Sequence, residues 1–207
     1  MKLLAATRSA GKQREFRRVL EPVGIEVVFP DDVGLSPKQA EDTLELGDSF
    51  ETNARKKAEY FVHLSGLPTV ADDSGLEVLS LGGAPGVRSR RWAGATGSDA
   101  EVDAANNAEL VRRLAGATGA RRGARYRCVL VYLPVVGAIQ RVFEGTSAGR
   151  ILEEPKGSGG FGYDPYFLSD DLGKTFGEAT PEEKDAVSHR GRALRGLVTA
   201  LAPSGSS

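Results

Sequence analysis

The sequence is poor in cysteine, in long hydrophobic runs and in excess charge of either sign. Its 207 residues include one cysteine, Cys128, so an intramolecular disulfide and a zinc site built from cysteines are both excluded. No hydrophobic run approaches the length of a membrane span, and the first one is broken at Thr7, too early for a signal-peptide core. A formal net charge of -1 provides no field that would attract nucleic acid or an anionic membrane. These absences predict a cytoplasmic protein with neither a nucleic-acid nor a membrane partner.

What the chain does contain is ordinary for a globular protein. Hydrophobic residues make up 40% and charged residues 27% of the sequence, and the length suits one α/β domain or two small lobes. Cys128 lies in the hydrophobic run 128–131, where a buried strand cysteine is favoured over a nucleophile. The composition therefore sets a size and a class, and the chemistry must come from local motifs.

The most unusual stretch is Pro68–Gly75, in which a short hydrophobic run ends in two adjacent carboxylates. The pattern predicts a strand that stops and turns, with Asp72 and Asp73 pointing to opposite faces. Ligands of open α/β sheets bind beyond the carboxyl ends of strands, where a carboxylate can hold Mg²⁺. The alternative is an Asp-Asp-Ser-Gly turn without chemistry, because these residue types are common in turns. Asp73 is our candidate for metal and water, and Asp72 for a supporting role.

The N-terminal segment has the pattern of a phosphate-binding unit. A predicted strand over 3–6 is followed by a small-residue loop over 7–11 and a helix over 12–20. Such a loop can present backbone N–H groups and a helix N-terminus to a phosphate. It is not a P-loop, because Ala6 replaces the first glycine of that motif and Gln13 its last Ser or Thr. A phosphate loop of another kind and a plain strand-to-helix turn both stay open.

The middle of the chain alternates predicted helices and strands. Capping-box spacings predict two helices. The first begins at Asp48 and ends near Leu64, and the second begins at Ser98. Further strands are predicted over 25–29, 76–78, 126–133, 142–143 and 149–152. A helix-rich first half and a strand-rich second half favour two lobes around one sheet.

Two further segments carry candidate ligand contacts. The glycine-rich loop 154–165 contains Phe161 and Tyr163, which can stack on a flat base, and its alternative is a long irregular turn. A final helix is predicted with Thr180 as its N-cap, followed by a frayed tail over 203–207. Lys184 and His189 lie about 140° apart on an ideal helix, so they contact different parts of a ligand or the helix starts later.

Short motifs in a fixed order extend over nearly the whole chain. They are Ala6-Thr7 with Gly11-Lys12, Phe50 with Asn53-Ala54 and Lys57-Ala58, Ala71–Leu76, Gly82–Gly86, Gly159–Pro165, Lys174–Phe176, and Glu183-Lys184 with Ser188–Arg190. With these motifs the chain resembles the inosine triphosphate pyrophosphatases, also called XTP/dITP diphosphatases. Phe-Gly-Tyr-Asp-Pro followed by Ser-His-Arg is the most specific part of the resemblance.

The resemblance implies a fold and an activity. The fold is α/β, with an elongated mixed central β-sheet flanked by helices and two lobes with the nucleotide cleft between them, in a single domain over 1–202. The activity is hydrolysis of ITP, dITP and XTP to the monophosphate and pyrophosphate with Mg²⁺, which keeps these nucleotides out of DNA and RNA. The resemblance also implies a homodimer.

The resemblance assigns roles to particular residues. Asp73 is similar to the general base that activates water, and Asp73 with Glu45 to the metal site. The triphosphate contacts would be Thr7, Arg8, Ser9, Ala10, Gly11, Lys12 and Ser74. The remaining nucleotide contacts would be Phe161, Gly162, Tyr163, Asp164, Lys184, His189 and Arg190.

These residue types suit the implied chemistry. Lys12, Lys184 and a metal can neutralise a triphosphate, and a carboxylate near the metal can orient or deprotonate water. His189 and Arg190 can donate to the 6-oxo group of a purine. Adenine has an amino donor at that position, so those donors would stay unpaired. Guanine also has a 6-oxo group, and its rejection must depend on the 2-amino group.

Two other classes of function remain open on the sequence. A phosphotransferase such as a small nucleotide kinase is disfavoured by the failed P-loop test and by the lack of an evident second-substrate site. A nucleotide-binding module without turnover is disfavoured by the presence of Asp73, Lys12 and Lys184 together. The three classes differ in the phosphorus product they release.

Overall fold

The strands form a six-stranded sheet in the order β2-β1-β3-β4-β5-β6 in a computed structural model that describes residues 1–202. β1 pairs in parallel with β2 and β3, and β5 pairs antiparallel with β6, so the sheet is mixed as predicted. The strands are β1 (Lys2–Ala5), β2 (Glu26–Val28), β3 (Thr69–Val78), β4 (Gly123–Leu133), β5 (Arg141–Ile151) and β6 (Phe167–Ser169). The helices are α1 (Ala10–Leu20), α2 (Phe50–Ser65), α3 (Asp99–Arg113), α4 (Pro181–Val187) and α5 (His189–Leu201).

The chain divides into two compact units, and strands β3, β4 and β5 each contribute to both. The first unit comprises Met1–Asp73, Cys128–Gly145 and the chain from Arg190, and the second comprises Ser74–Arg127 and Thr146–His189. The prediction of one domain over 1–202 stays a prediction, and the predicted tail 203–207 lies outside the described residues. No helix within residues 1–202 is long and apolar enough to cross a membrane.

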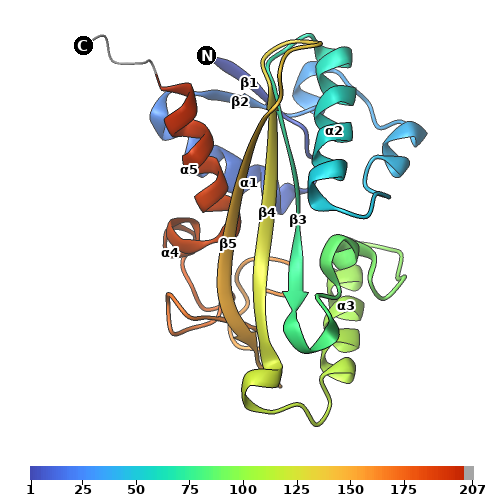
Figure 1. Ribbon diagram of the computed structural model, residues 1–207, viewed down its shortest axis with the longest axis vertical. Coiled ribbons are helices and arrows are strands. Elements are labelled where there is room, and N and C mark those ends of the chain that lie inside the picture. The colour runs from blue at the N-terminus through green and yellow to red at the C-terminus, as the bar shows by residue number, and fades with distance from the viewer. Residues whose placement is uncertain (203–207) are drawn as a thin grey trace. The chain divides into compact units, whose positions relative to one another are not determined.

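The core of the first unit has a layer on each face of its strands. Alternate residues of β1 point to opposite faces. Leu3 and Ala5 pack with side chains of α1 and α5, whereas Leu4 packs with α2. Figure 1 shows α5 and α2 on opposite sides of these strands. The first unit is therefore a three-layer α/β arrangement, in which α1 and α2 both direct side chains to the middle of β3, at Asp72 and Asp73.

The second unit has its own aromatic core. Tyr126 on β4 stacks with Phe176, with ring centroids 5.9 Å apart, and lies 4.7 Å from the ring of Phe167 on β6. Leu76 and Val78 from β3 and Leu110 from α3 are buried in the same cluster. This core supports α3 and the glycine-rich segment that precedes β6.

β3 is one continuous strand, which corrects the prediction that a strand stops at Asp73 and a second one begins at Leu76. Gly75 does not form a turn. A Cβ at Gly75 would overlap the carbonyl oxygen of Gly86 and the Ser89 hydroxyl, and that hydroxyl accepts a hydrogen bond from the Leu76 N–H at 2.9 Å. The glycine is thus required by the close approach of the segment Gly86–Arg91, and tertiary packing overrides the local turn preference.

β5 is also one strand, where the sequence predicted two short ones over 142–143 and 149–152. Gly145 and Gly149 both lie inside it. Gly149 pairs with Ser169 on β6, and a Cβ there would overlap the carbonyl oxygen of Leu168. A glycine within a strand here marks the close approach of a neighbouring backbone.

Two helix predictions also need correction. The N-cap of α2 is Ser49 rather than Asp48, because the Ser49 side chain accepts from the Thr52 N–H at 3.1 Å. The predicted C-terminal helix is two helices, since Ser188 is extended, with φ -67° and ψ 156°. The capping boxes at Thr180 and Ser98 are confirmed.

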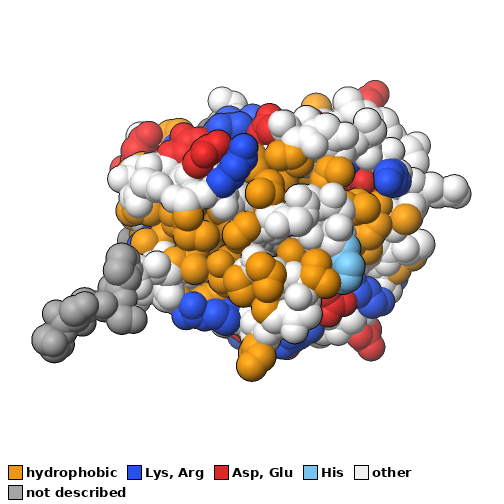
Figure 2. All heavy atoms as spheres, turned by 90° about the horizontal axis from the view of Figure 1, so that it is seen from above, with side chains coloured by type: hydrophobic (Ala, Val, Ile, Leu, Met, Phe, Trp, Pro, Cys, Tyr) orange, Lys and Arg blue, Asp and Glu red, His pale blue; other side chains and the backbone are white. Residues whose placement is uncertain are grey.

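The loop between β4 and β5 exposes several large hydrophobic side chains. Val135 and Val136 are about half exposed, and Ile139 is 91% exposed. Figure 2 views the molecule from above and shows hydrophobic side chains gathered on that face, with charged groups around them. Contiguous exposed hydrophobic surface of this kind is typical of an interaction site.

Candidate active site

The two carboxylates of β3 meet different partners, as alternation along a strand predicts. The Asp72 side chain is fully buried, and its Oδ2 lies 3.0 Å from Lys12 Nζ and 3.2 Å from the guanidinium of Arg190. Asp73 is 5% exposed, and its Oδ2 accepts a hydrogen bond of 2.7 Å from Asn53 Nδ2. One carboxylate is therefore enclosed by cations, and its neighbour meets a neutral amide.

The cations decide the protonation of Asp72. Burial alone would raise its pKa, but Lys12, Arg190 and Lys57 outweigh that effect and hold the pKa of Asp72 well below its ordinary value. Asp72 is therefore an anion that cannot take a proton from water near neutral pH. It balances the charge of the lysines around it.

The environment of Asp73 acts in the opposite direction. Burial raises the pKa of Asp73 to about 6, and the nearby Glu45 carboxylate adds to the rise. Lys57, Lys12 and the hydrogen bond from Asn53 oppose it without cancelling it. A carboxylate whose pKa lies near the working pH is suited to accept a proton during a reaction.

Asn53 and Lys57 place α2 in this cluster, although the sequence assigned neither of them to the site. Asn53 is fully buried and Lys57 is 7% exposed. Lys57 Nζ donates to the carboxylate of Glu45, and although burial lowers the pKa of Lys57, Glu45, Asp72 and Asp73 raise it above its ordinary value. The i, i+4 spacing on the side of α2 that also carries the buried Ala54 and Ala58 was the available signal.

Glu45 and Asp73 can supply a metal site in part. Lys57 holds the pKa of Glu45 below its ordinary value, so that carboxylate stays ionised. Among the described residues no group of three or more His, Cys, Asp and Glu side chains is arranged to hold a metal ion. Two carboxylates nevertheless fit Mg²⁺, which is commonly held by one or two carboxylates, with the remaining ligands from water and substrate phosphates.

The loop 7–9 leads into α1, which begins at Ala10. Ser9 is the N-cap residue, and the first turn of α1 contains no acidic side chain, so the N-terminal end of the helix favours an anion. Thr7 is buried, and its hydroxyl accepts from the Ser9 N–H at 3.2 Å. Lys12 extends from the first turn to Asp72.

Arg8 is directed away from this loop, although the sequence placed it among the triphosphate contacts. Its guanidinium forms ion pairs with Glu41, at 2.8 Å, and with Asp31, at 2.5 Å, and donates to the carbonyl of Leu35. These partners lie in the acidic segment 31–47. The structure therefore favours Arg8 as an anchor for the segment that carries Glu45.

Arg190 is likewise enclosed by carboxylates, although the sequence placed it near a purine base. It is 2% exposed, and it donates to Asp72 Oδ2 through two nitrogens and to the carboxylate of Glu15 through the third. Burial lowers the pKa of Arg190, but Glu15 and Asp72 raise it further than burial lowers it. This placement favours a structural role for Arg190, which compensates the buried charges of Asp72 and Glu15.

In the second unit, the predicted residues gather around Asp164. This carboxylate is 2% exposed and accepts from Lys184 Nζ at 2.6 Å, from the Phe161 N–H at 2.8 Å and from the Tyr126 hydroxyl at 3.3 Å. Lys184 Nζ also lies 4.7 Å from the centroid of the half-buried Phe161 ring. Asp164 thus links the glycine-rich loop to α4 and β4.

His189 belongs to the same group because of the interruption at Ser188. Its ring stacks on Tyr126, with centroids 4.6 Å apart and an interplanar angle of 7°. The regular helix that would have separated Lys184 and His189 by about 140° is absent at this point. Through Tyr126 and Asp164, His189 and Lys184 share one network.

Five more of the predicted contacts lie at the edges of these two groups. Ser74 follows Asp73 on β3 and is half-buried. The hydroxyl of the buried Tyr163 donates to the carbonyl of Ser89 at 2.8 Å, and Gly162 has a φ of +64°. Ala10 and Gly11 form the start of α1.

The first unit therefore brings together Asp73, Glu45, Lys12 and the N-terminus of α1, and adds Asn53 and Lys57 to the predicted set. Buried carboxylates with ammonium groups beside a helix N-terminus that has no side-chain cap, on a three-layer α/β scaffold, are typical of enzymes that act on phosphorylated ligands. Comparison with known families is more specific. A model of the Ham1 family matches residues 3–200, and the chain belongs to this family.

Individual relatives agree with this assignment over nearly their whole length. A dITP/XTP pyrophosphatase of Ralstonia nicotianae is 46% identical over 201 residues, which are 97% of this chain and 96% of that protein. One of Frankia alni is 43% identical over 202 residues, with 97% of each chain covered. Among solved structures, a HAM1 protein from Coxiella burnetii has a TM-score of 0.84 at 32% identity and covers 99% of this chain and 100% of its own. A nucleoside-triphosphatase / dITP/XTP pyrophosphatase from Mycobacterium abscessus has a TM-score of 0.71 at 44% identity, and the match covers 96% of this chain and 99% of that one.

Proposed function

We propose that this protein hydrolyses non-standard purine nucleoside triphosphates, namely dITP, XTP and ITP, to the monophosphate and pyrophosphate. The observation that carries the proposal is Asp73, a buried carboxylate whose pKa is raised to about 6 in a cluster with Glu45 and Lys57. Relatives that are 43% and 46% identical over nearly the full length are dITP/XTP pyrophosphatases, which supports the same substrates here.

The residues of the first unit suit attack by water on the α-phosphorus. The carboxylate of Asp73 takes a proton from the attacking water, the new P–O bond forms, and the bond from the α-phosphorus to its bridging oxygen breaks as pyrophosphate leaves. Lys12 and Lys57 offset the negative charge that gathers on the phosphate oxygens. The N-terminus of α1 supplies backbone N–H donors for the phosphates.

Mg²⁺ is part of this proposal. Glu45 and Asp73 would hold it, and when bound it would neutralise phosphate charge and lower the pKa of a coordinated water. The two carboxylates lie close enough that Glu45 raises the pKa of Asp73, and a divalent cation would relieve this repulsion.

Mg²⁺ affinity is expected to fall as the pH is lowered through about 6. The pKa of Asp73 is raised to about 6 by burial, so the ligand is mostly ionised at pH 7 and mostly protonated at pH 5, and affinity should be about tenfold weaker at pH 5. Titration calorimetry of the nucleotide-free protein at both pH values measures this. Asp73→Asn should remove the pH dependence, and an equal affinity of the wild type at pH 5 and pH 7 would contradict the assignment.

The residues of the second unit are proposed to bind the base. Phe161 offers a ring face for stacking, worth about 1–3 kcal/mol per base in comparable sites. His189 can donate to the 6-oxo group that hypoxanthine and xanthine share, whereas adenine presents an amino donor there. Lys184 is charged and beside Phe161, so it can contact a phosphate or a base oxygen.

The phosphorus product distinguishes this function from its alternatives. The protein is incubated with XTP, dITP and ATP in the presence of Mg²⁺, and the products are resolved by ³¹P NMR. We expect pyrophosphate from XTP and dITP and little product from ATP. Orthophosphate or transfer to an acceptor would indicate a phosphotransferase or phosphatase, and tight binding without turnover would indicate a binding module.

A homodimer and a cytoplasmic location remain predictions. The exposed hydrophobic side chains of the β4–β5 loop support an interaction surface in the first unit. No nucleic-acid partner is proposed, in keeping with the net charge of -1.

A further inference from the structure

The loop that carries Phe161 depends on glycines at two defined positions. Gly160 and Gly162 both have positive φ angles, +73° and +64°, which side-chain-bearing residues rarely adopt. A Cβ at Gly160 would overlap the Asp164 carboxylate, whereas nothing lies within 4 Å of a Cβ at Gly162. Packing does not hold Gly162, so its orientation must come from its hydrogen bonds.

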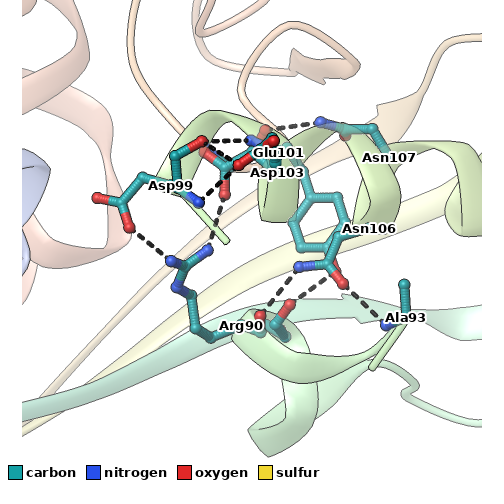
Figure 3. Close-up of polar contacts among 11 residues, drawn as sticks. Arg90, Ala93, Asp99, Glu101, Asp103, Asn106 and Asn107 are labelled. Atoms are coloured by element: carbon teal, nitrogen blue, oxygen red, sulfur yellow. Dashed lines mark hydrogen bonds and ion pairs between the residues drawn. The ribbon is translucent and has the colours of Figure 1, made fainter. Parts of the chain in front are cut away.

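Both polar backbone atoms of Gly162 are bound by α3. The Gly162 N–H donates to Asp103 Oδ2 at 2.7 Å, and the Gly162 carbonyl accepts from Asn107 Nδ2 at 2.9 Å. Asp103 and Asn107 are an i, i+4 pair and lie on one face of the helix. Figure 3 shows both side chains in the network of polar contacts on α3. One residue of the loop is thus fixed by two side chains of a single helix.

The helix that supplies this pair is itself held at several points. Ser98 and Glu101 form a capping box at its N-terminus. The Asn106 side chain is buried and bonds to the carbonyl of Arg90 at 3.0 Å and to the N–H of Ala93 at 2.9 Å (Figure 3). Arg90 pairs with Asp99 at 2.5 Å, and Asp103 Oδ1 lies 3.4 Å from Arg90. Asp103 and Asn107 therefore extend from a fixed support.

We propose that Asp103 and Asn107 are positioning residues that set the orientation of the Phe161 ring and thereby the selectivity for the purine base. This inference rests on the proposed function of Phe161 as the base-stacking residue. Gly162 follows Phe161 directly, so rotation of the peptide that joins them turns the ring. The Phe161 N–H is bound to Asp164, and with Gly162 fixed by α3 the backbone is anchored on both sides of the ring.

The expected result is a loss of selectivity rather than a general loss of activity. Asp103→Ala and Asn107→Ala should each raise the KM for XTP and dITP roughly tenfold, with kcat changed by about twofold or less. The ratio of kcat/KM for dITP to that for dATP should fall by a similar factor. Hydrogen–deuterium exchange should become faster in the segment 157–166 in both variants.

Matched variants separate positioning from general stability. Asp103→Asn keeps an oxygen that accepts from Gly162 and loses only the charge beside Arg90, so it should retain the wild-type KM within about threefold. Asp99→Ala removes a stronger contact to Arg90 on the same helix without touching the loop, and should leave the KM and the dITP to dATP ratio unchanged.

The outcomes distinguish this inference from the proposed function. If the wild type releases pyrophosphate but the Asp103 and Asn107 variants lower kcat/KM for dITP and dATP equally, or leave both unchanged, the positioning role is overturned. Unchanged exchange in the segment 157–166 would also overturn it. Absence of turnover by the wild type would instead overturn the proposed function.

Discussion

Replacing Asp73 with asparagine is expected to lower kcat for XTP and dITP by about 10²–10⁴-fold and to leave the folded structure intact. An amide cannot accept a proton from water and is a poor ligand for Mg²⁺. Its shape matches the carboxylate, and its oxygen can still accept the hydrogen bond from Asn53. The change therefore removes the chemistry with little change in packing.

The pKa of Asp73 predicts the direction of the stability effect. Burial raises that pKa from 3.8 to about 6, so the folded state binds the proton more tightly than the unfolded state does. Such a group costs stability as the pH rises from about 4 through 6, and the full cost is present at pH 7. Because asparagine is neutral and avoids this cost, the variant should unfold at a higher temperature than the wild type at pH 7 in the absence of Mg²⁺.

Two measurements test this prediction together. Pyrophosphate release gives kcat, and thermal unfolding without metal gives the stability of the same preparation. Asp42→Asn, a neutral replacement of an exposed carboxylate in the acidic segment, is the control and should match the wild type in both. An Asp73→Asn protein with nearly normal kcat would remove Asp73 from the role of general base.

The parts of the site that the sequence predicted are those encoded by neighbouring residues. The strand, loop and helix at the N-terminus depend on local periodicity and on the small residues of the loop 7–9, and the structure confirms them as β1 and α1. Alternation along β3 separated the partners of Asp72 from those of Asp73. The capping boxes at Ser98 and Thr180 are likewise local patterns.

The parts that the sequence did not predict depend on residues distant in the chain. Arg190 was predicted to contact a ligand because nothing near it in the sequence indicates a partner for its charge. Its partner Glu15 is 175 residues away. Gly75 suggested a turn because the segment that approaches it, Gly86–Arg91, is brought close only by folding. Lys57 was not assigned to the site, because lysine is rarely buried without a partner and its partner Glu45 is in a separate loop.

Asp72→Asn, the same substitution one residue earlier, is expected to have the opposite outcome, a large loss of stability. Asp72 is fully buried and compensates the charges of both Lys12 and Arg190. Removing one partner of a buried ion pair costs about 3–5 kcal/mol, because the remaining charge is left without compensation. Arg190 keeps Glu15, and the Lys12 side chain is 17% exposed and can reach water, so we expect about 3 kcal/mol. That corresponds to a fall of roughly 6–12 °C in Tm for a chain of this size.

The dependence of this loss on pH separates a charge effect from a packing effect. The cations hold the folded-state pKa of Asp72 well below its ordinary value, so its contribution to stability is fully present above the unfolded-state pKa of about 4. As the pH falls below that value, the unfolded state takes up the proton first and the wild type loses the contribution. The difference in the free energy of unfolding between the wild type and Asp72→Asn, measured by urea denaturation, should therefore be largest at pH 7 and smaller at pH 3. Asp73→Asn, which makes the same replacement at the neighbouring residue, is the control. A loss of equal size in both variants, or one that does not change between pH 7 and pH 3, would mean that the ion pairs of Asp72 do not stabilise the fold.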